Sequence, residues 1–150
     1  MDFNYLFTSL DGRINRAKYW AGVIIVVVAM LILQWIAVAI FGMGFLGRLI
    51  TFIIGLIALY PLYAVAGKRF QDRAKPAMYA LIGVALGLLY QLLGLFGLAG
   101  SPGSPGALDY ILGIAGIAVG IWYLIELGIL KGTSGPNQYG SDPLGGSAAT

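Results

Sequence analysis

The chain has 150 residues, of which 59% are hydrophobic and only 10% are charged. A soluble domain carries about 25% charged residues on its surface, so nine Lys or Arg and six Asp or Glu residues are too few to cover one. This composition argues against soluble globular, disordered and nucleic-acid-wrapping proteins, and it predicts a protein whose solvent is lipid.

Four long apolar runs follow one another along the chain, and they cover residues 19–41, 49–66, 77–99 and 110–130. A helix needs about 20 apolar residues to cross a bilayer, and a backbone in lipid must satisfy its own hydrogen bonds. We therefore expect an all-α membrane protein. Its single domain, 1–150, holds four transmembrane helices as two hairpins and ends in a cytoplasmic tail, 131–150.

The segment before the first run is amphipathic. Phe3, Leu6, Phe7 and Leu10 recur at helical spacing, which predicts a short helix lying in the membrane interface. A disordered tail is the alternative. The first run could also be a signal peptide, because residues 37–39 match a cleavage pattern, but the preceding stretch is long and acidic, so we expect it to remain as a helix.

The positive charges lie almost entirely on one side of the predicted membrane. Every Lys and Arg except Arg48 lies before the first run, between the second and third, or after the fourth. The positive-inside rule then places both termini in the cytoplasm, and the cytoplasmic side carries the whole net charge of +3.

Small residues predict how the helices pack, because they let backbones approach closely in lipid. The third and fourth runs each contain a GxxxG pair, and we expect their glycine faces to meet. Gln91 and Gln34 should point into the bundle and form an interhelical hydrogen bond, although a substrate path is the alternative. The predicted packing residues are Gly83, Gly87, Gln91, Gly94, Gly113, Gly116 and Gly120.

Three polar blocks, all predicted to be cytoplasmic, contain most of the remaining polar residues. They are residues 6–16, which include Gly12-Arg13 and Arg16; residues 68–73, Lys-Arg-Phe-Gln-Asp-Arg; and residues 132–143, Gly-Thr-Ser-Gly-Pro-Asn-Gln-Tyr-Gly-Ser-Asp-Pro. In order and spacing they resemble the domain of unknown function 805 family, along essentially the whole chain. This resemblance implies a small four-helix protein of the bacterial inner membrane, with no established activity.

The resemblance breaks at Gln71, where the family often has His, and at Lys68, where it has Arg. If that His were a catalytic base in relatives, this chain could not use it.

The polar blocks suggest two compatible roles. In the first, they form a polar latch in which the loop and tail fold back and lock the helix ends together. Glu126 would then pair with Arg69, Arg73 or another cytoplasmic cation, because an unpaired carboxylate one turn inside a helix is costly, and Asp72 and Asp142 would pair with Arg13 or Arg16. In the second, the blocks bind anionic lipid head groups or a partner protein. The candidate residues are Arg13, Asn15, Arg16, Lys68, Arg69, Gln71, Asp72, Arg73, Glu126, Asn137, Tyr139 and Asp142.

The absence of Cys and His from the chain removes the usual triads, thiolates and zinc ligands. We therefore expect no enzyme: no catalytic residue, no metal and no cofactor. The expected function is that of a structural or accessory membrane protein that binds lipid, and possible partners are a second protein or further copies of the chain, but not nucleic acid. A small transporter or channel component that acts as an oligomer is the alternative.

Overall fold

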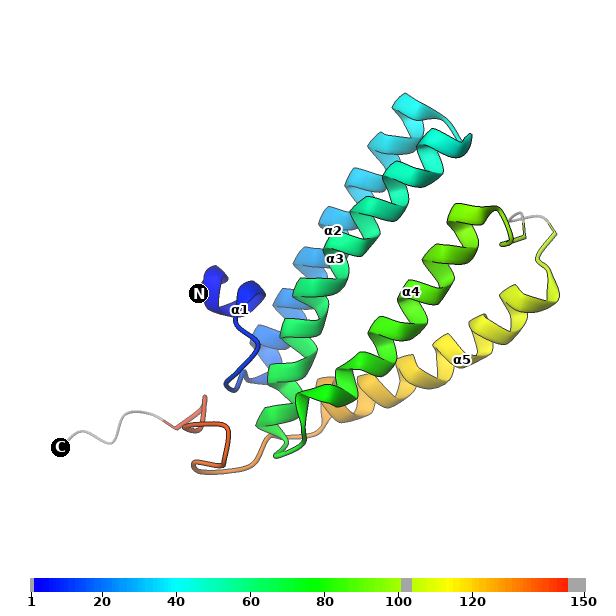
Figure 1. The fold of residues 1–150 in the computed structure, drawn as a ribbon. Coiled ribbons are helices and arrows are strands. Elements are labelled where there is room, and N and C mark those ends of the chain that lie inside the picture. Colours follow the sequence, from blue (N-terminus) through cyan, green and yellow to red (C-terminus); the bar gives the residue numbers. More distant parts are fainter. Residues whose placement is uncertain (1, 101–103, 146–150) are drawn as a thin grey trace.

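Four long helices form two hairpins in the computed structural model, which describes residues 2–100 and 104–145 (Figure 1). The elements in chain order are α1 (Phe3–Thr8), α2 (Arg16–Phe41), α3 (Phe45–Asp72), the 3-10 turn η1 (Ala77–Ala80), α4 (Leu81–Phe96), α5 (Ala107–Tyr123) and the π-helical turn η2 (Leu124–Ile129). Residues 146–150 of the predicted tail lie outside the described residues.

The four helices confirm the predicted class. The segments Arg16–Phe41, Phe45–Asp72, Ala77–Phe96 and Ala107–Ile129 are each long and apolar enough to cross a membrane. The clearest difference from the predicted bounds is in α3, which continues six residues past 66, through the charged block to Asp72. Charged residues can extend a membrane helix in this way because protein, and not lipid, surrounds them here: Lys68, Arg69 and Asp72 are all buried.

The predicted N-terminal helix exists, but it is short and packs on the bundle. The side chain of Asp2 caps α1 by accepting a hydrogen bond of 3.0 Å from the backbone N–H of Tyr5. Leu6 is only 1% exposed, whereas Phe3 and Leu10 at the ends of the apolar pattern are exposed. Because α1 contacts α3 and α2, the middle of its apolar face packs on the protein, whereas the ends of that face are exposed.

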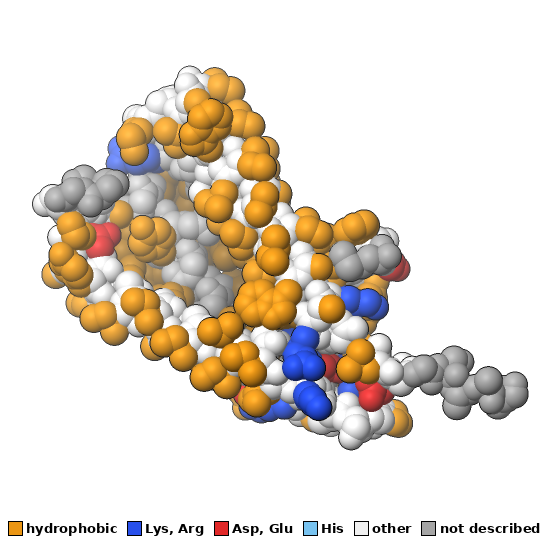
Figure 2. Space-filling view, turned by 180° about the vertical axis from the view of Figure 1, so that it is seen from behind, with side chains coloured by type: hydrophobic (Ala, Val, Ile, Leu, Met, Phe, Trp, Pro, Cys, Tyr) orange, Lys and Arg blue, Asp and Glu red, His pale blue; other side chains and the backbone are white. Residues whose placement is uncertain are grey.

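The two hairpins meet at one end and separate toward the other (Figure 1). We call the end that holds α1 and residues 131–145 the closed end, and the end with the α2–α3 and α4–α5 connections the turn end. Helix α3 is central, with contacts to α1, α2, α4, η1 and η2, whereas α5 contacts α4 and has no buried residue. Figure 2 shows charged side chains gathered at the closed end and apolar side chains over both arms.

The prediction that the glycine faces of α4 and α5 meet is wrong. A Cβ added at Gly113, Gly116 or Gly120 would meet nothing within 4 Å. Gly83 of α4 instead packs on Tyr123, whose hydroxyl accepts a hydrogen bond from the Gly83 N–H at 3.1 Å. Gly87, the other member of the GxxxG pair of α4, packs on α3. The glycines of α4 therefore pack on an aromatic ring and on α3, and the glycines of α5 pack on neither α4 nor any other described residue.

An aromatic cluster builds the core near the closed end. Phe70, which is fully buried, packs against the rings of Tyr79, Trp122 and Tyr123 with centroids 5.5–5.7 Å apart. This contact joins α3 to the second hairpin, and it lies beside the charged residues of the same helix end.

Candidate functional site

The three polar blocks converge at the closed end, although they lie far apart in sequence. We call this assembly the latch, and define it by Arg13, Lys68, Arg69, Asp72, Arg73, Glu126, Thr133 and Asn137. Its members come from the segment before α2, the end of α3, η2 and the tail. The latch therefore connects both hairpins and both terminal segments.

Asp72 lies at the centre of the latch and binds two arginines. Arg13 Nε donates to Oδ1 of Asp72 at 3.0 Å, and Arg69 Nη1 donates to Oδ2. The side chains of all three residues are at most 3% exposed. Buried charges are tolerated only when paired and hydrogen-bonded, and here one carboxylate serves two guanidinium groups from different segments.

Arg13 also holds the tail. Its Nη1 donates to the carbonyl oxygens of Gly135 at 2.7 Å and Gly140 at 3.2 Å, and its Nη2 donates to that of Thr133 at 2.6 Å. The planar guanidinium presents five donors in a fixed geometry. One side chain thus fixes the path of the tail against the N-terminal segment.

Three more arginines bind the carbonyl groups at the end of η2, where a helix leaves its last C=O groups without intrahelical partners. Arg69 donates to Leu127 O at 2.8 Å and to Leu130 O at 2.5 Å. Arg16 donates to Ile129 O at 2.9 Å, and Arg73 donates to Lys131 O at 2.5 Å. Cations at a helix C-terminus are also favoured by its dipole.

Lys68 performs the same task for α1. Its ammonium group donates to the carbonyl oxygens of Tyr5 at 2.8 Å, Leu6 at 2.9 Å and Ser9, and it lies 5.1 Å from the centroid of the Tyr5 ring. The side chain is fully buried. Its charge is therefore balanced by carbonyl dipoles and a π face in the absence of a carboxylate partner among the described residues.

Glu126 joins the second hairpin to the loop that follows α3. Its Oε1 lies 3.0 Å from Arg73 Nε and 2.8 Å from Lys75 Nζ. Arg73 was an expected partner. Arg69, the other named partner, binds Asp72 and backbone carbonyls instead.

The tail is fixed by short polar side chains. Asn137 Nδ2 donates to Gln71 O at 3.0 Å and to Thr133 Oγ1 at 2.9 Å, and the Thr133 N–H donates to Asp72 O at 2.9 Å. The expected pairing of Asp142 with an arginine is not found among the described residues. Its carboxylate accepts the N–H groups of Leu144 and Gly135 at 2.9 Å, which lowers the pKa of Asp142.

Three candidate residues take local positions beside the latch. Asn15 caps α2 by accepting the Lys18 N–H at 2.9 Å, and Tyr139 donates its backbone N–H to Asn137 Oδ1 at 2.8 Å. Gln71 is 5% exposed, and its Oε1 has no hydrogen-bond partner within the described ranges.

Sequence reasoning missed Thr133 and most of the acceptors, and it covered Lys75 only as another cytoplasmic cation that could pair with Glu126. Most acceptors in the latch are backbone carbonyls, which every residue has, so no sequence signal marks the ones that are used. Tyr5 was also missed. Its aromatic ring covers Lys68, and its hydroxyl donates to Arg13 O at 3.3 Å; burial raises the pKa of this hydroxyl.

The carboxylates of the latch are already paired. Across residues 2–100 and 104–145, no group of three or more His, Cys, Asp or Glu side chains could hold a metal ion. Each latch carboxylate is occupied by two cationic side chains. The arrangement can fix helix ends and present the cations that remain exposed.

Comparisons with known proteins assign the family. No curated protein and no solved structure matches the chain. A family model described as "Protein of unknown function (DUF805)" matches residues 7–141, a range that contains all four long helices, the second polar block and nearly all of the first and third. The chain therefore belongs to this family of proteins of unknown function.

Proposed function

We propose that the chain is a non-enzymatic accessory protein of the bacterial inner membrane, with the closed end in the cytoplasm, where it binds anionic lipid head groups. The observation that carries the proposal is a division among the cations of the closed end. Arg13, Lys68 and Arg69 are buried in the latch, whereas Lys18 and Lys131 remain exposed.

The exposed lysines belong to two segments that meet at the closed end. Arg16 bonds to Ile129 O at 2.9 Å, which brings the start of α2, the helix of Lys18, beside the end of η2, which Lys131 follows in the chain. Trp20, which is 39% exposed, donates to Gly128 O at this junction. Lysines beside an interfacial Trp match the composition of membrane surfaces that contact head groups.

The proposed orientation depends on charge placement. Arg48 is the only Lys or Arg near the turn end, and cytoplasmic loops carry the excess of such residues. The proposal of a non-enzymatic role depends on the lack of Cys and His and on the pairing of both latch carboxylates with cations.

The test is purification of the full chain in native-lipid particles, followed by mass spectrometry of the retained lipids and proteins. We expect anionic lipids to be enriched over the bulk membrane. In the double variant Lys18→Gln/Lys131→Gln, the enrichment of anionic lipids should fall about fivefold for each lysine replaced, since each cation near an anionic surface contributes about 1 kcal/mol.

The matched control is Lys18→Arg/Lys131→Arg, which keeps both charges and should keep the enrichment. A bare monomer with bulk lipid composition would contradict the proposal. A retained second protein would instead support action through a partner.

A further inference from the structure

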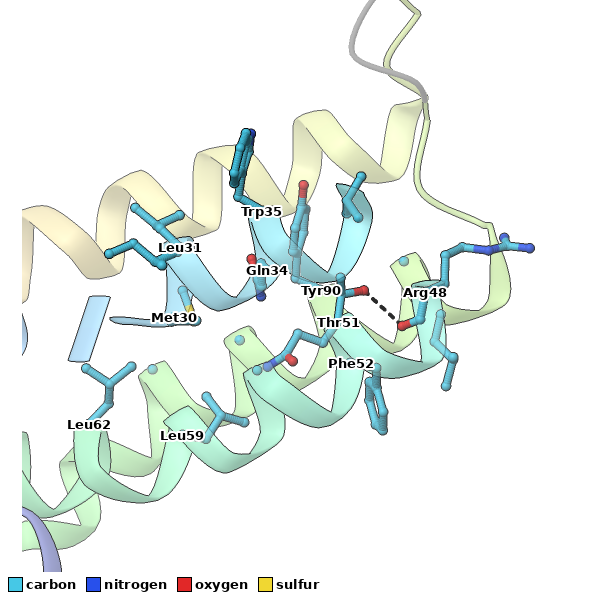
Figure 3. Close-up of a pocket in the computed structure, with 18 residues that line it drawn as sticks. Met30, Leu31, Gln34, Trp35, Arg48, Thr51, Phe52, Leu59, Leu62 and Tyr90 are labelled. Carbon is cyan, nitrogen blue, oxygen red and sulfur yellow. Dashed lines mark hydrogen bonds between the residues drawn. The ribbon is translucent and has the colours of Figure 1, made fainter. Parts of the chain in front are cut away.

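A groove lies between the two hairpins on the inner faces of α2, α3 and α4 (Figure 3). Its volume is about 1230 Å³, which exceeds the roughly 300–1,000 Å³ of small-molecule pockets. Side chains such as Met30, Leu31 and Leu62 make most of its wall apolar. Gln34 and Gln91 also line it, but the predicted hydrogen bond between them is wrong: Gln91 Oε1 is buried and has no partner within the described residues. The two hairpins separate toward the turn end (Figure 1), and Arg48 and Gly94 line the groove there.

The groove has the length of a lipid chain. Its α3 wall runs from Arg48 to Leu62, and these 14 residue steps span about 21 Å at 1.5 Å per residue. One leaflet of the hydrocarbon core is about 15 Å thick. An acyl chain that enters at the turn end can therefore lie in the groove along its whole depth in the leaflet.

Arg48 lies at the turn-end mouth, and its side chain extends toward the connection between α4 and α5 (Figure 3). Its Nε is buried and has no hydrogen-bond partner, and the guanidinium forms no ion pair in the part of the chain that the structure describes. The dipole of α3 disfavours a cation in its first turn, whereas the C-terminal end of α4, against which the guanidinium lies, favours one. No carboxylate pairs with Arg48 among the described residues.

Several acceptors near Arg48 at the turn end already have donors. The Arg48 guanidinium lies against Gly97 at the end of α4, but the carbonyl of Gly94 accepts the Gly97 N–H, and that of Leu93 accepts the Leu98 N–H. Asp109 accepts the N–H groups of Gly100 at 2.8 Å and Gly106 at 2.7 Å.

We propose that this groove binds an anionic phospholipid, with its phosphate at Arg48 and one acyl chain between α2, α3 and α4. The groove combines an apolar wall with one cation that has no carboxylate partner among the described residues. An amphipathic anion carries the complementary groups, an apolar chain and a negative charge. A second copy of the chain would place another apolar helix in the groove and leave Arg48 without a counterion. This site is separate from the lysines of the closed end.

The test uses the full chain in phosphatidylcholine vesicles with a trace of phosphatidylglycerol that carries a diazirine in one acyl chain. After illumination, peptide mass spectrometry locates the crosslinks. We expect them at Met30, Leu59 and Leu62 in excess of those at Ile57 and Ile114, which face outward with 68% and 69% exposure. A phosphatidylcholine probe with the same diazirine should label the groove less.

Two variants separate charge from space. Arg48→Gln should lower groove labelling by the phosphatidylglycerol probe about fivefold. Gly94→Leu should remove the labelling by filling the groove, because a Cβ at Gly94 meets nothing within 4 Å and the fold can accept it. Gly113→Leu on α5, where a Cβ is equally free, is the matched control.

Lys18→Gln/Lys131→Gln should leave groove labelling unchanged, so the failure of this site and that of the closed-end site can be told apart. Labelling of the groove no stronger than that of the outward faces, or labelling unaffected by both Arg48→Gln and Gly94→Leu, would overturn the proposal. Crosslinks between two copies through the groove would also overturn it.

Discussion

Glu126 shows how the latch uses single charges. Its side chain is 9% exposed and faces Arg73 and Lys75, whose side chains are 23% and 39% exposed. Pairs at the surface contribute about 0–1 kcal/mol, whereas loss of one partner from a fully buried pair costs about 3–5 kcal/mol. The pairs of Glu126 lie between these limits because only one partner is buried.

We expect Glu126→Gln to destabilise the protein by about 2 kcal/mol, because Arg73 and Lys75 lose their shared carboxylate. The measurement is thermal unfolding in detergent. Asp11→Asn is the control: it removes a charge from an exposed residue whose side chain makes no ion pair among residues 2–100 and 104–145. Equal melting temperatures for the two variants would mean that the Glu126 pairs contribute nothing to stability.

The need for a partner at Glu126 was predictable from sequence, since a carboxylate inside an apolar run is costly. The choice of Arg73 and Lys75 over Arg69 was not, because it depends on how η2 crosses the end of α3. The same holds for Asp142, whose carboxylate is satisfied by nearby N–H groups in its own turn.

At the scale of elements, hydropathy predicted the four helices because lipid requires long apolar runs with internal hydrogen bonds. It could not predict that α3 extends through Lys68 and Asp72, because that extension depends on tertiary burial. The glycine patterns also misled: Gly83 packs on Tyr123 and not on α5 glycines. Small residues permit a close contact, but they do not choose the partner.

Helix α1 provides an element-scale prediction. Lys68→Met should release α1 from the bundle, because the carbonyl oxygens of Tyr5, Leu6 and Ser9 lose their common donor. Hydrogen exchange at residues 3–8 should accelerate by at least tenfold, since loss of hydrogen bonds to a charged group costs about 1.5–3 kcal/mol.

The control is exchange in α4, which has no contact with α1 and should keep its rates. Lys68→Arg should preserve part of the protection because it keeps the charge and the donors. If α1 exchanged equally slowly in Lys68→Met, its attachment would come from Leu6 packing and from the hydrogen bond of the Tyr60 hydroxyl to Thr8 O.

At the scale of the whole molecule, the angle between the hairpins decides whether the groove exists. Sequence could not predict this angle, because helices in lipid gain little from burying apolar faces against each other. The latch and the aromatic contact of Phe70 join the hairpins at the closed end, and the turn end has no comparable polar network among the described residues. The latch should therefore set the width of the groove from a distance.

This argument is testable because the chain contains no Cys, so spin labels can be placed at will. With Met43→Cys and Leu98→Cys, at turn-end positions 77% and 61% exposed, we expect one narrow distance distribution by pulsed electron resonance. Arg13→Gln should broaden it, since Arg13 links Asp72 to the tail. Labels at Met43 and Ile57, within one hairpin, should keep their distance in both proteins. If the distance distribution between the hairpins stays narrow in Arg13→Gln, the packing of α3 on α4 sets the angle between the hairpins, and the latch fixes only the tail.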